Sequence, residues 1–203
     1  MLWIGGATDC GKTSITELLA QRYGLQRYHY DRHDLRQMTK LAQTKPRYRE
    51  FLEASLEEKW VNTAPEDMFA FLMRGFSDRF PLVLDDFLEM PKQPNIIAEG
   101  FGLMSALVAP LLSNRSQAVW LVPTSKFKLA SMERRGKPSF RDKVSDPEKA
   151  ARNLFQRDML LAEYVRSQAD NHGLRVIEVD GSRSIERVAE LVEDHFAPHL
   201  KDS

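Results

Sequence analysis

Residues 3–14 read WIGGATDCGKTS and contain the pattern G-x-x-x-x-G-K-[ST] without a gap, from Gly6 to Thr13. Two glycines let the backbone curl so that successive N–H groups point at phosphate oxygens. The lysine reaches the β- and γ-phosphates, and the threonine hydroxyl is a ligand for Mg²⁺. A short apolar run precedes the pattern and helical spacing follows it. This strand–loop–helix context is the one in which the pattern binds a nucleoside triphosphate.

The loop therefore predicts a site for ATP with Mg²⁺. Cys10 occupies a variable position, where it either fills space or, at a helix start that lowers the thiol pKa, is redox-sensitive. The predicted nucleotide-binding residues are Gly6, Ala7, Thr8, Asp9, Cys10, Gly11, Lys12, Thr13 and Ser14.

Composition limits the remaining classes of protein. The 203 residues are 42% hydrophobic and 29% charged, with a net charge of zero, so no overall field attracts nucleic acid or an anionic membrane. No apolar run is long enough to span a bilayer, and a single cysteine suits a reducing compartment. We therefore expect one cytoplasmic domain, residues 1–203, with no membrane partner and with nucleic acid disfavoured.

Buried apolar runs alternate with helical segments along the chain. Most of these runs are continuous, which is typical of parallel strands covered by helices on both faces. We predict a three-layer α/β/α fold of the P-loop NTPase class with a mostly parallel five-stranded sheet. The expected strands are residues 2–4, 25–30, 95–98, 118–122 and 175–179.

The region between the second and third strands, residues 35–92, is expected to be a helical insertion over one side of the sheet. Within it, Pro81 is expected to end a helix. Further along, Ser145 and Glu148 have capping-box spacing at the start of another helix.

The order of these motifs resembles that of the P-loop kinases of small molecules, and the resemblance covers nearly the whole chain. This group includes nucleoside-monophosphate kinases, uridine-kinase-like enzymes, chloramphenicol phosphotransferase, zeta toxins and the polynucleotide 5′-kinase domain. It implies transfer of the γ-phosphoryl group of ATP to a hydroxyl or phosphate of a small acceptor. Besides the loop, the segments that carry it are YHYDRHD (28–34), IIAEGF (96–101) and ERRGKPSFRDK (133–143).

The resemblance implies specific acidic residues around the transferred group. An acidic residue after the second strand activates the acceptor hydroxyl; Asp31 stands there, and Asp34 is the alternative. Glu99 follows the third strand, where these kinases often have a carboxylate near the metal, so Thr13 and Glu99 are the predicted metal residues. Asp85 and Asp86 are instead assigned to a helix start or an acceptor contact.

Two histidines and an arginine in the same region have open roles. DLRQM (34–38) resembles the polynucleotide-kinase stretch in which an arginine holds a phosphate of the acceptor, and Arg36 would be that residue. His29 and His33 are interpreted as exposed loop residues rather than acid–base groups.

A basic loop after the fourth strand resembles the mobile lid of these kinases. Residues 133–143 include five basic residues, and cations closing over a triphosphate stabilise the charge on the transferring phosphoryl group. A plain solvated loop is the alternative. The predicted catalytic residues are Lys12, Asp31, Arg134, Arg135 and Arg141.

Two further stretches are candidate ligand contacts. EVDGSRS (178–184) matches the segment that passes the adenine base, which makes Gly181 and Arg183 candidates, although an ordinary turn explains them equally well. In the insertion, Lys45, Arg47, Arg49 and Trp60 either line an acceptor site or belong to the surface and core.

The predicted function is an ATP-dependent kinase of a small molecule. One alternative is a nucleic-acid 5′-kinase, which requires a basic groove leading to Asp31. The other is an ATPase or nucleotide-dependent switch with no acceptor. The identity of the acceptor, the choice of ATP or GTP and the oligomeric state stay open, because specificity lies in the insertion, where no motif is found.

Overall fold

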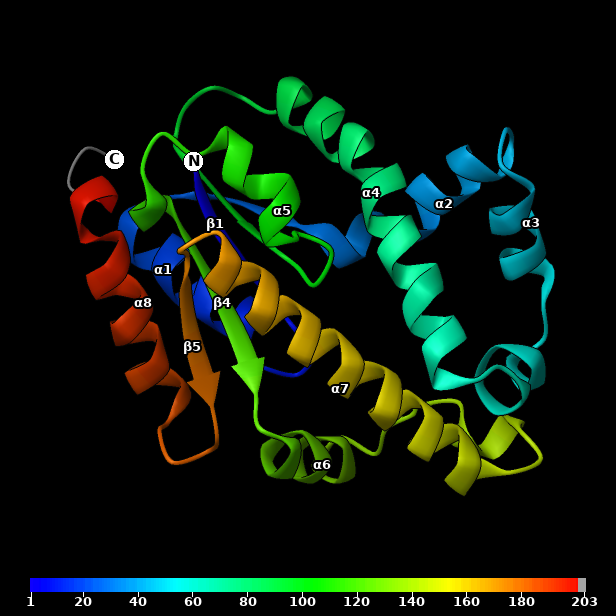
Figure 1. Ribbon diagram of the computed structural model, residues 1–203. Coiled ribbons are helices and arrows are strands. Elements are labelled where there is room, and N and C mark those ends of the chain that lie inside the picture. The colour runs from blue at the N-terminus through cyan, green and yellow to red at the C-terminus, as the bar shows by residue number, and fades with distance from the viewer. Residues whose placement is uncertain (201–203) are drawn as a thin grey trace.

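The structure is a computed structural model that describes residues 1–200, and it contains a five-stranded sheet between two layers of helices (Figure 1). All strand pairs are parallel, in the order β2-β3-β1-β4-β5. The predicted three-layer α/β/α fold is confirmed. The strands are β1 (Leu2–Gly6), β2 (Gln26–His29), β3 (Ile96–Glu99), β4 (Ala118–Pro123) and β5 (Arg175–Val179).

Helices α1 and α8 pack together on one face of the sheet, and α5 and α7 cover the other (Figure 1). Within residues 1–200, no helix is both long and apolar enough to cross a membrane. The helices are α1 (Lys12–Tyr23), α2 (Asp34–Ala42), α3 (Pro46–Glu53), α4 (Pro65–Glu89), α5 (Ser105–Val108), α6 (Ser125–Arg134), α7 (Pro147–Asn171) and α8 (Ile185–Leu200). Short turns are η1 (Tyr30–His33), the π-helical η2 (Glu58–Asn62), η3 (Ala109–Leu111), η4 (Arg115–Gln117) and η5 (Arg141–Lys143).

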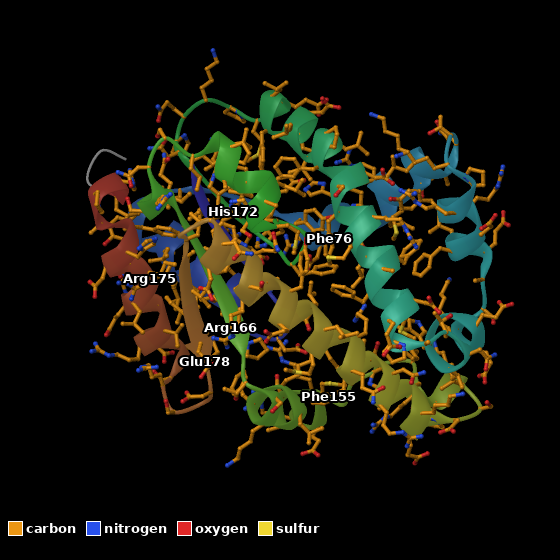
Figure 2. All side chains as sticks on the ribbon, in the orientation of Figure 1. Phe76, Phe155, Arg166, His172, Arg175 and Glu178 are labelled. Carbon is orange, nitrogen blue, oxygen red and sulfur yellow. The ribbon has the colours of Figure 1, made fainter. Side chains whose placement is uncertain are left out.

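Between β2 and β3 the chain forms α2, α3, η2 and α4, and α4 runs alongside α7 (Figure 1). The expectation that Pro81 ends a helix is wrong, because α4 continues through it to Glu89. A proline in a helix costs about 3 kcal/mol. Phe76, Phe80 and Val83 on the same helix are buried in the core, and this packing offsets that cost. Phe76 lies on the side of α4 that faces the sheet (Figure 2).

The predicted capping box at Ser145 and Glu148 is also wrong. Asp146 is the N-cap of α7, and its carboxylate accepts a hydrogen bond from the Lys149 amide. Ser145 instead donates its amide and hydroxyl to Glu57 in the insertion. The serine therefore joins two distant segments, a role that no local spacing indicates.

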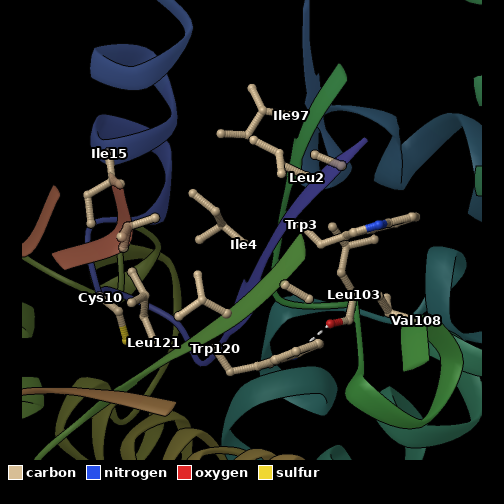
Figure 3. Close-up of a cluster of buried hydrophobic side chains, with 14 of the residues drawn as sticks. Leu2, Trp3, Ile4, Cys10, Ile15, Ile97, Leu103, Val108, Trp120 and Leu121 are labelled. Atoms are coloured by element: carbon tan, nitrogen blue, oxygen red, sulfur yellow. Dashed lines mark hydrogen bonds between the residues drawn. The ribbon is translucent and has the colours of Figure 1, made fainter. Parts of the chain in front are cut away.

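The core beneath β1 is built around Trp120 of β4 (Figure 3). Its indole is fully buried and donates a hydrogen bond of 3.0 Å to the carbonyl of Leu103. A Cβ atom at Gly5 would collide with this indole, so glycine lets β1 lie directly against it. This packing fixes the strand that leads into the phosphate-loop motif.

A buried ionic cluster joins that loop to α6 and α7. The Lys128 ammonium lies 2.5 Å from both Asp9 Oδ2 and Asp158 Oδ2 and donates to the Thr8 hydroxyl. Lys128 is 1% exposed. Burial would raise the pKa of the Asp9 carboxyl from 3.8, but hydrogen bonds from Lys128 and Lys137, and their charges, lower it to about 2. The cluster therefore holds the loop through a charged, desolvated contact.

Trp120→Phe should lower the free energy of unfolding by about 2 kcal/mol, because it removes a hydrogen bond, leaves the Leu103 carbonyl unpaired and opens a small cavity. Trp3→Phe is the matched control: Trp3 is 3% exposed, and its indole N–H has no acceptor within residues 1–200. Urea denaturation of both variants measures the difference. Equal losses would contradict the role given to the hydrogen bond.

The Asp9 ion pairs should make stability depend on pH in the acid range. A folded-state pKa below the unfolded value of 3.8 stabilises the fold fully above about pH 4, and this contribution is lost as the pH falls toward 2. Between pH 5 and 2 the wild type should lose roughly 2 kcal/mol more than Asp9→Asn. Urea titrations at several pH values test this, with the exposed Asp85→Asn as the control. Parallel wild-type and Asp9→Asn curves would refute the assignment.

Candidate active site

The loop between β1 and α1 has the backbone shape of an anion cradle. Asp9 and Gly11 have φ values of 65° and 80°, in the left-handed region. Helix α1 starts at Lys12 without a side-chain cap, so the N–H groups of its first turn are free to bind an anion. A cavity of about 340 Å³ lies over the loop. We call it the phosphate cavity; it is lined by Thr8, Asp9, Cys10, Gly11, Lys12, Thr13, Ser14, Asp31, Glu99, Phe101, Arg135 and Lys137.

Two residues of the predicted loop, Gly6 and Ala7, lie behind this lining, and the thiol of Cys10 within it is buried. Gly6 ends β1 and Ala7 is 1% exposed. The Ala7 carbonyl accepts a hydrogen bond of 2.6 Å from the Lys12 ammonium, which lies folded across the loop. Burial raises the pKa of the Cys10 thiol to about 12, which favours the space-filling interpretation over the redox one.

An oxygen-rich pair of side chains stands beside Lys12. The Thr13 hydroxyl donates to Glu99 Oε1 over 2.9 Å. Hydroxyl and carboxylate oxygens are the ligands that Mg²⁺ takes from proteins, with phosphate and water oxygens completing its shell. Residues 1–200 hold no group of three or more histidine, cysteine and acidic side chains arranged for a metal. The donor set at Thr13 and Glu99 thus fits a magnesium ion that shares its ligands with a nucleotide.

His29 lies behind this pair, and the interpretation of it as an exposed loop residue is wrong. It is 7% exposed, and its Nδ1 lies 2.8 Å from the same Glu99 oxygen. The sheet register explains the contact, because His29 at the end of β2 pairs with Glu99 at the end of β3. A hydrogen bond of this kind fixes the orientation of a carboxylate near a metal. Sequence spacing gave no sign of it, since the two residues are 70 positions apart.

The structure separates the two candidate acceptor carboxylates. Asp31 in η1 lines the phosphate cavity. Its side chain is exposed, but desolvation by the surrounding protein raises its pKa; the charges of Lys12 and Arg79 oppose this shift, and the charge of Glu99 adds to it. Asp34 forms an ion pair with Arg79 and lines a different, larger cavity. Of the two carboxylates, Asp31 is therefore the one that lies at the phosphate cavity.

The predicted lid residues are dispersed. Arg135 and Lys137 line the phosphate cavity and hold Asp9 Oδ1 at 3.0 and 2.6 Å. Arg134 is exposed at the end of α6, away from this lining. Arg141 lies in η5 and lines a separate cavity at the start of α7. In this conformation, one of the three predicted arginines faces the phosphate cavity, together with Lys137, which the prediction did not select.

The candidate adenine segment adjoins the loop but not its cavity. Gly181 and Arg183 are exposed after β5 and are absent from the cavity lining. Gly181 has a φ of 85°, and a Cβ atom there would lie 3.0 Å from the Phe127 ring. Ile185 packs directly on Gly11, so the segment flanks the phosphate loop.

The insertion encloses a second cavity of about 650 Å³, which we call the insertion cavity. It is lined by residues of α2, α3, η2 and α4, and it shares Thr8 and Phe101 with the phosphate cavity. Arg47 and Trp60 line it, whereas Lys45 and Arg49 do not.

The expectation for Arg36 is wrong. It binds Asp86 of α4 at 2.6 Å and lies outside the linings of both cavities. Asp86 also accepts the Tyr28 hydroxyl at 2.9 Å, and it lies within α4 rather than at a helix start. The arginine–carboxylate pair therefore connects α2, β2 and α4 and is separate from the site.

No family model matches the chain, and no curated protein matches it. Solved structures do. A gluconokinase from Sinorhizobium meliloti shares 14% identity with a TM-score of 0.54. The match covers 99% of this chain and 93% of the gluconokinase. A shikimate kinase from Acinetobacter baumannii, solved with shikimate, shares 17% identity with a TM-score of 0.54. The match covers 98% of this chain and 94% of the shikimate kinase.

A deoxyadenosine kinase from M. mycoides, solved with its product dCMP and dCDP, shares 11% identity with a TM-score of 0.51, and covers 98% of this chain and 100% of its own. At such low identities the likeness concerns the fold. The chain has the fold of the P-loop small-molecule kinases, as its motifs predicted.

Proposed function

We propose that this protein is an ATP-dependent kinase that transfers a γ-phosphoryl group to a hydroxyl of a small molecule. The observation that carries the proposal is that two cavities are adjacent: the phosphate cavity and the insertion cavity share Thr8 and Phe101 in their walls. Asp31 lines the phosphate cavity, and the insertion cavity has the size of a small-molecule site. A nucleotide and an acceptor can therefore approach each other inside the protein.

The proposed reaction is an in-line displacement. The acceptor oxygen attacks the γ-phosphorus, the bond to the β,γ-bridging oxygen breaks, and ADP leaves. Asp31 accepts the proton of the attacking hydroxyl, for which a carboxylate with a raised pKa is suited. Bound magnesium would supply charge neutralisation at the phosphates, with Thr13 and Glu99 as its protein ligands.

Three cations stabilise the developing charge in this proposal. Lys12 exchanges the Ala7 carbonyl for the β- and γ-phosphates. Arg135 and Lys137 form ion pairs with Asp9 and line the phosphate cavity. When the nucleotide binds, they exchange this carboxylate for phosphate oxygens. Each cation already has an oxygen partner before the nucleotide arrives, so no bare charge is buried.

Asp31→Asn should reduce phosphoryl transfer by about 10²- to 10⁴-fold, because it removes the proton acceptor, and should leave ATP binding nearly unchanged. Lys12→Ala should weaken ATP binding itself. The measurement uses γ-labelled ATP with a metabolite extract, and label is followed into discrete compounds. Asp85→Asn, an exposed carboxylate of α4, is the matched control. Label released only as inorganic phosphate would overturn the kinase proposal in favour of an ATPase or switch.

Glu99→Gln and His29→Gln should each raise the Mg²⁺ concentration for half-maximal activity about tenfold, since both disturb the carboxylate that orients the ion. His33→Gln is the control, because this ring stacks on Tyr28 outside the phosphate cavity. Magnesium titrations at saturating ATP give the three values. An unchanged magnesium requirement in the first two variants would remove Glu99 from the metal site.

A further inference from the structure

The walls of the insertion cavity are unusually aromatic for a site that would receive a small polar acceptor. Six rings line it, from α3, η2, α4 and the loop after β3: Tyr48, Phe51, Trp60, Phe71, Phe76 and Phe101. Aromatic side chains provide large flat contact areas and bind other flat rings by stacking. The lining therefore favours a ligand with a planar ring.

These rings are held in fixed orientations. Phe51 stacks on Phe71 with ring centres 4.4 Å apart at 21°. Trp60 stacks on Phe140 at 5.0 Å and 22°. Tyr48 is fully buried and donates its hydroxyl to Asp78 at 2.7 Å. A ring entering the cavity would meet surfaces that are already ordered, which lowers the entropic cost of binding.

Two guanidiniums of the cavity lining, those of Arg79 and Arg157, connect it to the β2–η1 segment and the phosphate loop. Other charged side chains line the cavity from the ring-bearing elements: Arg47, Glu50, Glu58, Lys59, Asp67 and Arg74. Arg157 of α7 pairs with Asp158, whose other oxygen accepts the Thr8 hydroxyl. Arg79 pairs with Asp34, and its guanidinium lies 4.0 Å from the ring centre of Tyr30, the neighbour of Asp31. The cavity thus has two paired guanidiniums at the end that adjoins Thr8, and both rings and charged side chains along its body.

The end of the cavity that adjoins Thr8 is suited to hydroxyl groups rather than to a free anion. Both guanidiniums already have a carboxylate partner, so their charge is largely balanced. Each retains one buried N–H without an acceptor within residues 1–200, Nη2 of Arg79 and Nε of Arg157. An N–H donor beside a carboxylate acceptor matches a hydroxyl, which both donates and accepts. A small polyhydroxy acid would make no stacking contact with the aromatic side chains of the cavity.

We propose that the acceptor is a neutral alcohol joined to a planar aromatic or heteroaromatic ring. Its hydroxyl-bearing end lies toward Asp31, and its ring lies between α3, η2 and α4. This inference rests on the proposed function for the assignment of the insertion cavity to the acceptor. The inferred acceptor differs in chemical class from the small hydroxy acids that some kinases phosphorylate.

Ligand binding without nucleotide tests the inference separately from phosphoryl transfer. The ring-bearing probes are deoxyadenosine, deoxycytidine, thymidine and 4-nitrophenyl β-glucoside, and the ring-free probes are shikimate and gluconate. Calorimetry gives affinities, and tryptophan emission gives location, because Trp3 and Trp120 lie in the core while Trp60 lines the cavity. We expect at least one ring-bearing probe to bind saturably and more tightly than both acids, and to change the Trp60 emission.

Phe71→Leu should weaken that binding about tenfold, which is the scale of one lost stacking contact. Trp60→Phe should remove the emission change, and ATP affinity should stay constant in both variants. Phe155→Leu is the matched control, since Phe155 of α7 is not in the cavity lining (Figure 2). The difference between nucleosides and the aryl glucoside distinguishes a heterocycle from a plain aromatic ring.

The inference is overturned if shikimate or gluconate binds more tightly than every ring-bearing probe, if no ring-bearing probe binds, or if Phe71→Leu leaves binding unchanged. A ring-bearing ligand that binds but is never phosphorylated would instead count against the proposed function and leave the ligand class intact.

Discussion

One buried ammonium connects the parts of this molecule that any reaction would use. Lys128 contacts Asp9 and Thr8 of the phosphate loop and Asp158 of α7. It projects from α6, whose end leads into the basic loop, and α7 packs along α4 of the insertion. Breaking a buried ion pair by removing one partner costs about 3–5 kcal/mol. The relative positions of loop, basic segment and insertion are thus coupled through a single desolvated charge.

The second constraint is the register of the parallel strands. β1, β2 and β3 end at the same edge of the sheet, so the residues that follow them converge there although they are far apart in sequence. Glu99 lies opposite both Ile4 and His29. A sheet of this kind presents its ligands beyond the carboxyl ends of its strands. The pairing of Glu99 with Thr13 and His29 follows from topology rather than from any local motif.

The sequence predicted the parts of the structure that local chemistry determines. The phosphate loop and the parallel fold follow from a contiguous pattern and from continuous apolar strands. Local rules fail at Pro81 and Ser145, because tertiary packing and a distant carboxylate outweigh local preferences there. The choice between Asp31 and Asp34 required the positions of both cavities. In the basic loop, charge alone could not distinguish Arg135, which reaches Asp9, from Arg141, which lies at another cavity.

The two carboxylates after β2 have environments that suit different tasks. Asp34 has its charge balanced by Arg79, and a paired carboxylate is a good hydrogen-bond acceptor but a poor proton acceptor. Asp31 is exposed at the wall of the phosphate cavity and has no comparable ion pair within residues 1–200, and partial desolvation by the surrounding protein raises its pKa. A group that must take a proton from an alcohol needs this higher basicity. In the proposed reaction, the ion pair of Arg79 with Asp34 therefore favours Asp31 as the carboxylate that deprotonates the acceptor.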